Sequence, residues 1–185
     1  VYAELLPELD ALSRAHVAMA LRELGFDATV GRQFDAAAEA VRLGVQPRHE
    51  RLFNRLMAML VEDGVLARDG ASRCVVGTLP SSIDTSARYD ALLARFGAVD
   101  GELRTLRRCG GKLAQVLSGA QDPLQLLFPD GSFTEAQKLY VESPYARTYS
   151  GALTEGLSAA IASLPSDAPL RILEIGAGTG GTTGF

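Results

Sequence analysis

Residues 170–185 read LRILEIGAGTGGTTGF and contain the most informative motif of the chain. It starts with a short apolar run that contains one acid, Glu174, and continues into glycines at 176, 178, 180 and 181. An apolar run of this length is typical of a buried parallel strand. Glycines have no Cβ, so a ligand can approach the backbone there. The stretch therefore predicts the first strand and the glycine-rich loop of a nucleotide-type cofactor site.

The identity of the cofactor depends on the acid. Gly176, Gly178 and Gly181 also fit G-x-G-x-x-G, the pattern of dinucleotide-binding proteins. Glu174, however, would repel a pyrophosphate and suits a cation such as a sulfonium. A dinucleotide domain often begins with its glycine motif, whereas residues 1–169 precede this one and contain no other βαβ unit. We favour S-adenosylmethionine over a dinucleotide, and over a glycine turn that binds nothing.

Composition excludes several other classes. The chain has 185 residues, 47% of them hydrophobic, and a net charge of −4, so no general basic field would collect nucleic-acid phosphates. Cys74 and Cys109 stand apart from His16 and His49, which predicts neither a metal site nor a disulfide framework, and gives both histidines structural roles. No run reaches the roughly 18 apolar residues that span a bilayer, and no signal peptide is visible. We expect a cytoplasmic protein with no membrane or nucleic-acid partner.

The N-terminal part has the element order of a winged-helix unit. Apolar spacing and glycine stops predict three helices, and Asp69-Gly70 predicts a hairpin. The expected helices cover 8–25, Phe34–Leu43 and 48–63, and the expected strands cover 65–68 and 73–76.

A winged helix raises the alternative of a DNA-binding regulator. Arg48, Arg51 and Arg55 share one side of the third helix. Residues 1–70 nevertheless hold eight Arg and no Lys against eleven Asp and Glu, and non-specific DNA affinity depends on neutralising several phosphates. We therefore favour a solvated or subunit-facing helix.

The remainder is expected to be mainly helical. Helices are predicted near 84–96, 101–118 and 134–141, with an apolar loop at Asp122–Gly131 between the last two. Ser143-Pro144 is an N-cap followed by Pro at the first helical position, so a long helix should run to about Leu164, with a stripe at Tyr149, Leu153, Leu157, Ile161 and Leu164. Tyr140, Tyr145 and Tyr149 are expected to pack in the core, and Tyr140 has the alternative of covering a cofactor carboxylate.

Several stretches together resemble the methyltransferase domain of modular type I polyketide synthases and hybrid peptide–polyketide megasynthases. The matching pieces follow one another in order along almost the whole chain: Leu12–Gly25, His49–Leu56, Glu62–Leu66, Asp122–Pro129, Leu139–Pro144 and Ile172–Thr183. The resemblance implies a mainly α fold, in which a helical lid with a small winged-helix-like hairpin leads into a truncated α/β class I methyltransferase core. We expect a winged-helix-like lid part at 1–79, a helical lid part at 80–143, and core residues at 144–185.

The resemblance also implies a reaction and partners. Such domains methylate the α-carbon of a β-ketoacyl group on the phosphopantetheine arm of an acyl carrier protein, beside neighbouring synthase domains. By this reading Glu174, Gly176, Gly178 and Gly180 line the S-adenosylmethionine groove, and Tyr140 is a further candidate.

The chain departs from the family pattern after Gly180. The second strand, with the acid that holds the ribose, and the catalytic His and Glu would lie further along, so we assign no catalytic residue here. We expect this fragment to be inactive alone. A non-catalytic remnant that only spaces synthase domains stays open as the alternative.

Overall fold

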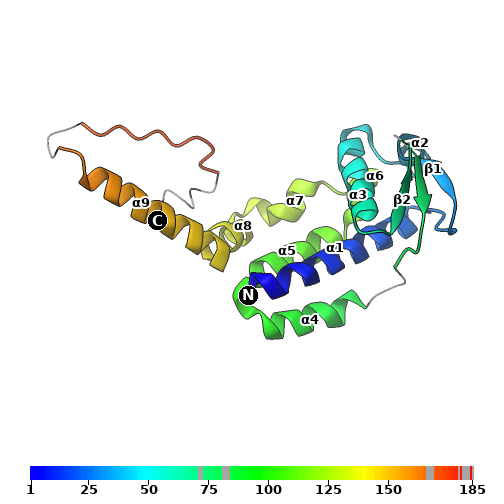
Figure 1. The fold of residues 1–185 in the computed structure, drawn as a ribbon, viewed down its shortest axis with the longest axis horizontal. Coiled ribbons are helices and arrows are strands. Elements are labelled where there is room, and N and C mark those ends of the chain that lie inside the picture. Colours follow the sequence, from blue (N-terminus) through cyan, green and yellow to red (C-terminus); the bar gives the residue numbers. More distant parts are fainter. Residues whose placement is uncertain (71–72, 81–83, 166–168, 179, 181–183, 185) are drawn as a thin grey trace.

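The computed structural model describes residues 1–70, 73–80, 84–165, 169–178, 180 and 184. Over these residues the protein is mainly helical and contains one small three-stranded sheet, as predicted. The sheet lies at one end of an elongated molecule, and the last long helix, α9 (Pro144–Ala162), extends away from the helical body at the other (Figure 1).

The sheet end has the predicted winged-helix order, with one strand more than the sequence indicated. The elements are α1 (Tyr2–Glu23), β1 (Gln33–Asp35), α2 (Ala36–Arg42), the 3-10 turn η1 (Pro47–His49), α3 (Glu50–Glu62), β2 (Leu66–Asp69) and β3 (Arg73–Val76). The sheet is antiparallel in the order β1-β3-β2. The hairpin is confirmed.

The expectation of a helix from Phe34 was wrong at its start. Phe34 lies in β1 opposite Cys74 and is buried. Asp35 then caps α2, because its Oδ1 accepts hydrogen bonds from the Ala37 and Ala38 amides, both at 3.0 Å. The helix begins only after this cap.

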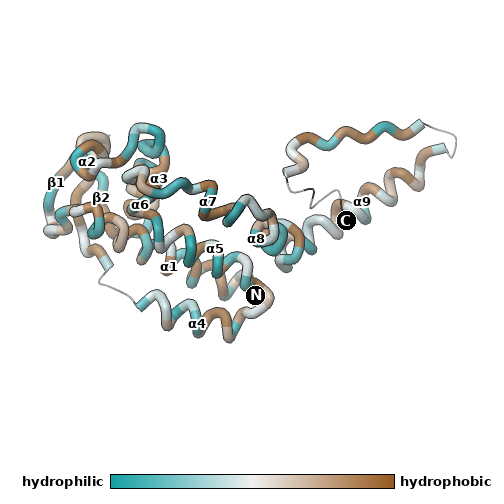
Figure 2. Tube along the Cα trace, turned by 180° about the vertical axis from the view of Figure 1, so that it is seen from behind, coloured by the Kyte–Doolittle hydropathy of each residue, from teal (hydrophilic) through white to brown (hydrophobic). Residues whose placement is uncertain are grey.

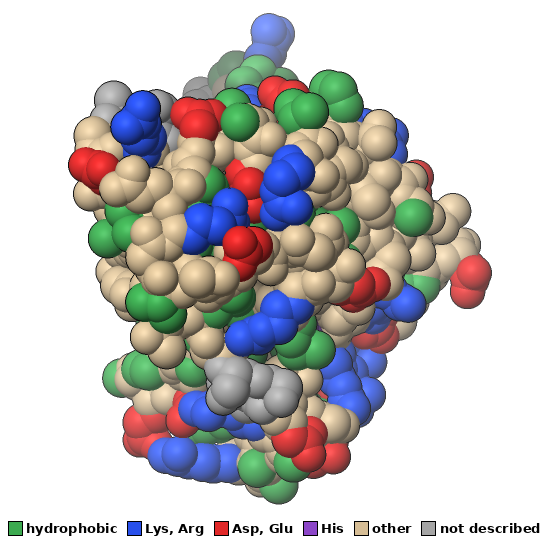
Figure 3. Space-filling view, turned by 90° about the vertical axis from the view of Figure 1, so that its right-hand side faces the viewer, with side chains coloured by type: hydrophobic (Ala, Val, Ile, Leu, Met, Phe, Trp, Pro, Cys, Tyr) green, Lys and Arg blue, Asp and Glu red, His purple; other side chains and the backbone are tan. Residues whose placement is uncertain are grey.

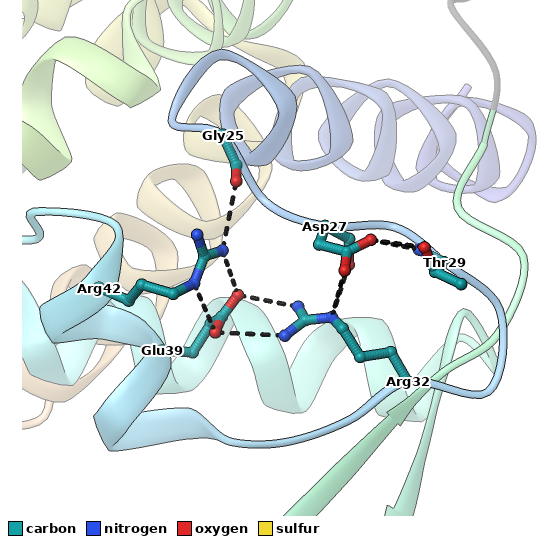
Figure 4. A network of polar contacts seen from close by, with 6 residues as sticks. All are labelled: Gly25, Asp27, Thr29, Arg32, Glu39 and Arg42. Atoms are coloured by element: carbon teal, nitrogen blue, oxygen red, sulfur yellow. Dashed lines mark hydrogen bonds and ion pairs between the residues drawn. The ribbon is translucent and has the colours of Figure 1, made fainter.

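A buried carboxylate ties α2 to the loop that precedes β1. The side chain of Glu39 is 5% exposed, and it accepts hydrogen bonds from Arg32 Nη2 at 2.8 Å and from Arg42 Nη2 at 2.6 Å (Figure 4). These contacts, first that with Arg42, hold the pKa of Glu39 below its ordinary value.

Surface charge at the sheet end is mixed. Lys and Arg side chains alternate with Asp and Glu, and no single basic patch covers this face (Figure 3). Arg55, one of the three arginines behind the DNA-binding alternative, is paired with Glu62 at 2.6 Å. This arrangement does not favour contact with a row of phosphates.

Two cores share helix α1. The first lies under the sheet and is built around Leu21, Phe34, Phe53 and Leu60. The second joins the start of α1 to helices later in the chain: α4 (Thr85–Arg95), the 3-10 turn η2 (Gly97–Val99) and α5 (Asp100–Gly110). Its fully buried members include Leu5, Leu12, Tyr89 and Leu103.

The single helix expected at 101–118 is two helices, α5 and α6 (Leu113–Ser118). The break follows Gly110, where the chain passes close to His16. A Cβ built on Gly110 would lie 2.5 Å from His16 Cγ, so the close approach requires glycine.

The loop expected at Asp122–Gly131 contains a helix. Asp122 Oδ1 accepts a hydrogen bond from the Leu124 amide at 2.9 Å, and Pro123 is the first residue of α7 (Pro123–Leu127). A 3-10 turn, η3 (Pro129–Gly131), follows. The short helix expected at 134–141 is α8 (Thr134–Gln137) with a π-helical turn, η4 (Lys138–Glu142).

Helix α9 begins as predicted, and Ser143 Oγ caps it by accepting from the Ala146 amide at 3.1 Å. Its apolar stripe, however, is uncovered: Tyr149, Leu153, Leu157, Ile161 and Leu164 are between 42% and 62% exposed. Figure 2 shows hydrophobic stretches along α9 where it extends away from the helical body. The expectation that Tyr140, Tyr145 and Tyr149 pack in the core was wrong, since they are 60%, 57% and 62% exposed.

The strand expected at 170–175 is not formed. Residues 170–175 have no strand structure, and Ile172, Leu173 and Ile175 are 73%, 83% and 88% exposed. A strand needs a neighbour to hydrogen-bond with, and the described residues place none beside this segment.

Candidate functional site

The glycine segment has a backbone conformation that favours glycine. Gly176, Gly178 and Gly180 have φ of +79°, +57° and +72°, a region that side-chain-bearing residues rarely enter. The Gly180 amide donates to the Ala177 carbonyl at 2.8 Å and closes a turn. Cβ atoms on Gly176 and Gly180 would meet nothing within 4 Å, so backbone conformation, and not crowding, requires glycine there.

Glu174 precedes this turn and is exposed, as are Gly176 and Gly178. An exposed carboxylate beside a bare glycine backbone leaves room for a cationic ligand. Residues 179 and 181–183 belong to the same predicted loop and lie outside the described part of the chain, so Gly181 is not placed.

Tyr140 lies elsewhere, on η4. It lines a small, mostly apolar cleft with Thr105, Leu127, Phe128, Glu135, Ala136 and Leu139. None of the described residues of the glycine segment lines that cleft. The contact between Tyr140 and a cofactor therefore stays a prediction.

A polar junction fixes the start of α9 against the body. Tyr2 Oη donates to Glu102 Oε1 at 2.6 Å and accepts from the Tyr145 amide at 3.3 Å. The rings of Tyr2 and Tyr145 also meet edge to face, with centroids 6.1 Å apart. Because this junction lies at the base of α9, it sets the direction in which the helix leaves the body.

The two histidines have no catalytic setting. His16 is 4% exposed, and its Nε2 lies 2.9 Å from Tyr89 Oη. Burial lowers the pKa of His16 and raises that of Tyr89. His49 Nε2 contacts only the neighbouring Arg48 Nε, at 3.2 Å, among the contacts of the described residues. Within the described ranges, no three His, Cys, Asp or Glu side chains cluster as metal ligands would.

The structure also contains a cleft of about 620 Å³ that was not predicted from the sequence. It lies between α4, α5 and the η3–η4 segment. Its charged lining consists of Arg104, Arg107, Arg108, Lys138, Asp100 and Glu135. The signal that could have revealed it is the spacing of the three arginines, since residues three and four apart share a helix face.

No family model matches the chain, whereas individual proteins match it along nearly its whole length. Non-reducing polyketide synthase prhL of Penicillium brasilianum is 31% identical over 180 residues, which are 97% of this chain and 7% of that synthase. Methylphloroacetophenone synthase of Cladonia uncialis is 35% identical over 184 residues, again 97% of this chain and 7% of that synthase.

Comparison with solved structures points to the same group of enzymes as the sequence relatives do. The CurJ carbon methyltransferase is 35% identical with a TM-score of 0.93, and the match covers 98% of this chain and 48% of that one. The CMeT domain of the citrinin polyketide synthase is 29% identical with a TM-score of 0.82, at the same coverage. The resemblance to methyltransferase domains of polyketide synthases is thus confirmed. The chain spans about half the length of these methyltransferase structures. No helix in the described ranges is long and apolar enough to cross a membrane.

Proposed function

We propose that this chain is the N-terminal lid portion and first cofactor segment of an S-adenosylmethionine-dependent carbon methyltransferase domain in a polyketide synthase. The domain would act on β-ketoacyl groups held by an acyl carrier protein, among neighbouring synthase domains. The observation that carries the proposal is the run of three positive-φ glycines behind Glu174, in a chain similar throughout to carbon methyltransferases.

The glycine segment fits the cofactor. Its bare backbone admits a ligand at close range, and the exposed Glu174 carboxylate suits the cofactor's positive charge. Bound there, S-adenosylmethionine would supply an electrophilic methyl group. Gly176, Gly178 and Gly180 would line its groove, Glu174 would hold its charged end, and Tyr140 would cover it from the lid.

The exposed apolar face of α9 supports a position inside a larger domain. Leu153, Leu157 and Ile161 are 42–49% exposed, and Ile172 and Ile175 are more so. Apolar surface of this extent is normally covered in a finished domain. In the longer protein we propose that the remaining core strands pair with residues 170–175 and that core residues cover α9.

The test compares this chain with a protein extended to about twice its length, as in the solved methyltransferases. Calorimetric titration with S-adenosylmethionine should show tight binding to the extended protein and none to this chain, because this chain spans only about half the length of the solved methyltransferases. Glu174→Gln in the extended protein should weaken binding about tenfold, the contribution of one charged contact.

Glu155→Gln supplies the matched control, since Glu155 is an exposed acid on α9 outside the glycine segment. Equal affinity in the Glu174→Gln and Glu155→Gln proteins would contradict the assignment of Glu174. Micromolar binding to the unextended chain would contradict the proposal that this chain supplies only part of the cofactor groove. An extended protein that binds no cofactor would favour the non-catalytic remnant.

A further inference from the structure

The cleft between α4, α5 and the η3–η4 segment is positively charged in a chain of net charge −4. Four cations and two acids line it. Both acids are already paired: Asp100 with Arg104, and Glu135 with Arg108 at 3.6 Å and with Lys138 at 3.4 Å. Arg107 is paired as well, with a third acid, Asp90 of α4, at 3.4 Å, so a surplus of one positive charge is left at the cleft.

The arginines are held in place from behind. Arg107 Nη2 donates to Ser86 Oγ at 2.8 Å, and its guanidinium lies 5.6 Å from the centroid of the Tyr89 ring. Arg108 Nε donates to the Leu126 carbonyl. Fixed guanidinium groups lose little conformational freedom on binding, so the cleft is organised for an anion before one arrives.

Donor capacity remains on Arg104, whereas Arg108 Nη2 is buried with no hydrogen-bond partner within the described structure. Arg104 contacts Asp100 through Nε and is 57% exposed. Guanidinium groups present forks of parallel N–H donors, a geometry that matches phosphate oxygens.

The other walls of the cleft are apolar, so a ligand that fills it needs an uncharged part as well as an anionic group. Leu93, Leu103 and Pro129 line the same cleft as the cations. A free inorganic anion would use only the charged wall. We infer that the cleft binds a phosphate ester whose uncharged organic arm lies along the apolar wall.

Two sources could supply this chemistry: a free small molecule, or the phosphopantetheine arm of a carrier protein. In the part of the chain that the structure describes, the residues that line the cleft lie between 89 and 138, outside the glycine segment. The inference therefore holds whether or not the proposed methyl transfer is correct, and this chain can be tested as it is.

Titration calorimetry of the chain at low salt tests the inference with three probes: 4′-phosphopantetheine, pantetheine and inorganic phosphate. We expect 4′-phosphopantetheine to bind at least about tenfold more tightly than either part alone, since charged hydrogen bonds and apolar contact both contribute. Equal binding of pantetheine would overturn the phosphate site, and equal binding of phosphate would overturn the organic arm.

Arg104→Gln should weaken 4′-phosphopantetheine binding about tenfold, the effect of one charge-assisted hydrogen bond. Arg55→Gln is the matched control, because Arg55 is likewise exposed, at 64%, and paired with one acid, but lies on α3. Equal losses in both variants would show general charge attraction and overturn the site. A holo acyl carrier protein that binds more tightly than free 4′-phosphopantetheine, while its apo form does not bind, would support the cleft and assign the arm to a carrier. Weaker binding of the holo form would support it as a small-molecule site.

Discussion

His16 Nε2 lies 2.9 Å from Tyr89 Oη, and this buried hydrogen bond joins the middle of α1 to α4. Both side chains are almost fully buried, at 4% and 1% exposed. The other ring nitrogen, His16 Nδ1, has no partner within the described structure. The pair therefore depends on a single contact to satisfy a buried imidazole.

Tyr89→Phe should destabilise the fold by about 1–3 kcal/mol, the cost of leaving a buried polar group unsatisfied, because His16 then has no partner on either nitrogen. Urea unfolding measures the change. Tyr149→Phe is the control: Tyr149 is 62% exposed, and its variant should stay within about 0.5 kcal/mol of the wild type. Equal effects in the two variants would contradict a structural role for the pair.

Acid should weaken the fold through His16. Burial lowers its pKa, so the unfolded chain takes up this proton at a higher pH than the folded chain does. The free energy of unfolding is therefore highest above about pH 6.5, where His16 is neutral in both states. It decreases as the pH falls below about 6.5, by at most about 1.4 kcal/mol per pH unit. Urea unfolding across this window should show the loss, and His16→Gln should reduce it. A slope that persists in His16→Gln and is lost in His49→Gln would contradict the assignment.

Gly110→Ala should lower the thermal stability of the fold, whereas Gly156→Ala should not. Alanine in a helix normally stabilises by about 1 kcal/mol over glycine. At Gly110 the new methyl would lie 2.5 Å from His16 Cγ, and such overpacking costs about 1–3 kcal/mol. Gly156 is exposed on α9 with nothing within 4 Å of a Cβ. Thermal unfolding should therefore give a lower Tm for Gly110→Ala and an unchanged or higher Tm for Gly156→Ala. A raised Tm for Gly110→Ala would show that the two helices separate easily.

Glu39→Gln should be strongly destabilising. It leaves Arg32 and Arg42 without their shared carboxylate, and we expect a loss of roughly 3 kcal/mol, the lower end for a broken buried pair, because Arg42 is 48% exposed. Chemical denaturation at neutral pH measures it. Glu62→Gln, which removes an exposed pair with Arg55, should have a much smaller effect. If both variants lose the same stability, the burial of Glu39 has no energetic consequence.

Local signals in the sequence predicted the elements that local interactions form. Ser143 and Asp69-Gly70 act within a few residues, and the cap and the hairpin both occur. Strand β1 was missed because its three residues form a strand only through pairing with β3, far along the chain. At Asp122-Pro123 an acid followed by proline is a helix-start signal, and α7 begins there within the stretch predicted to be a loop.

Burial was the harder property to predict. The periodic stripe of α9 was correctly recognised as apolar, yet periodicity identifies a face and does not supply the surface that covers it. The glycines at 176, 178 and 180 were predicted to leave room for a ligand, and their positive φ is a further finding of the structure. The basic cleft was not predicted, because its cations come from two segments that only the fold brings together.

Because the apolar stripe of α9 is exposed, we expect Leu157→Gln to affect stability differently in this chain and in the extended protein. In this chain Leu157→Gln should leave stability unchanged within about 0.5 kcal/mol, since Leu157 is 49% exposed, and should reduce self-association and hydrophobic-dye binding. Val41→Gln, at an isolated site 75% exposed, should reduce neither. In the protein extended to the length of the solved methyltransferases, the same Leu157→Gln should instead destabilise by about 2–3 kcal/mol, the value of a newly buried leucine that has been replaced by a polar group. Sedimentation of the short chain and unfolding of the extended one measure the two effects. If Leu157→Gln left the extended protein as stable as the wild type, the core would not cover this face of α9.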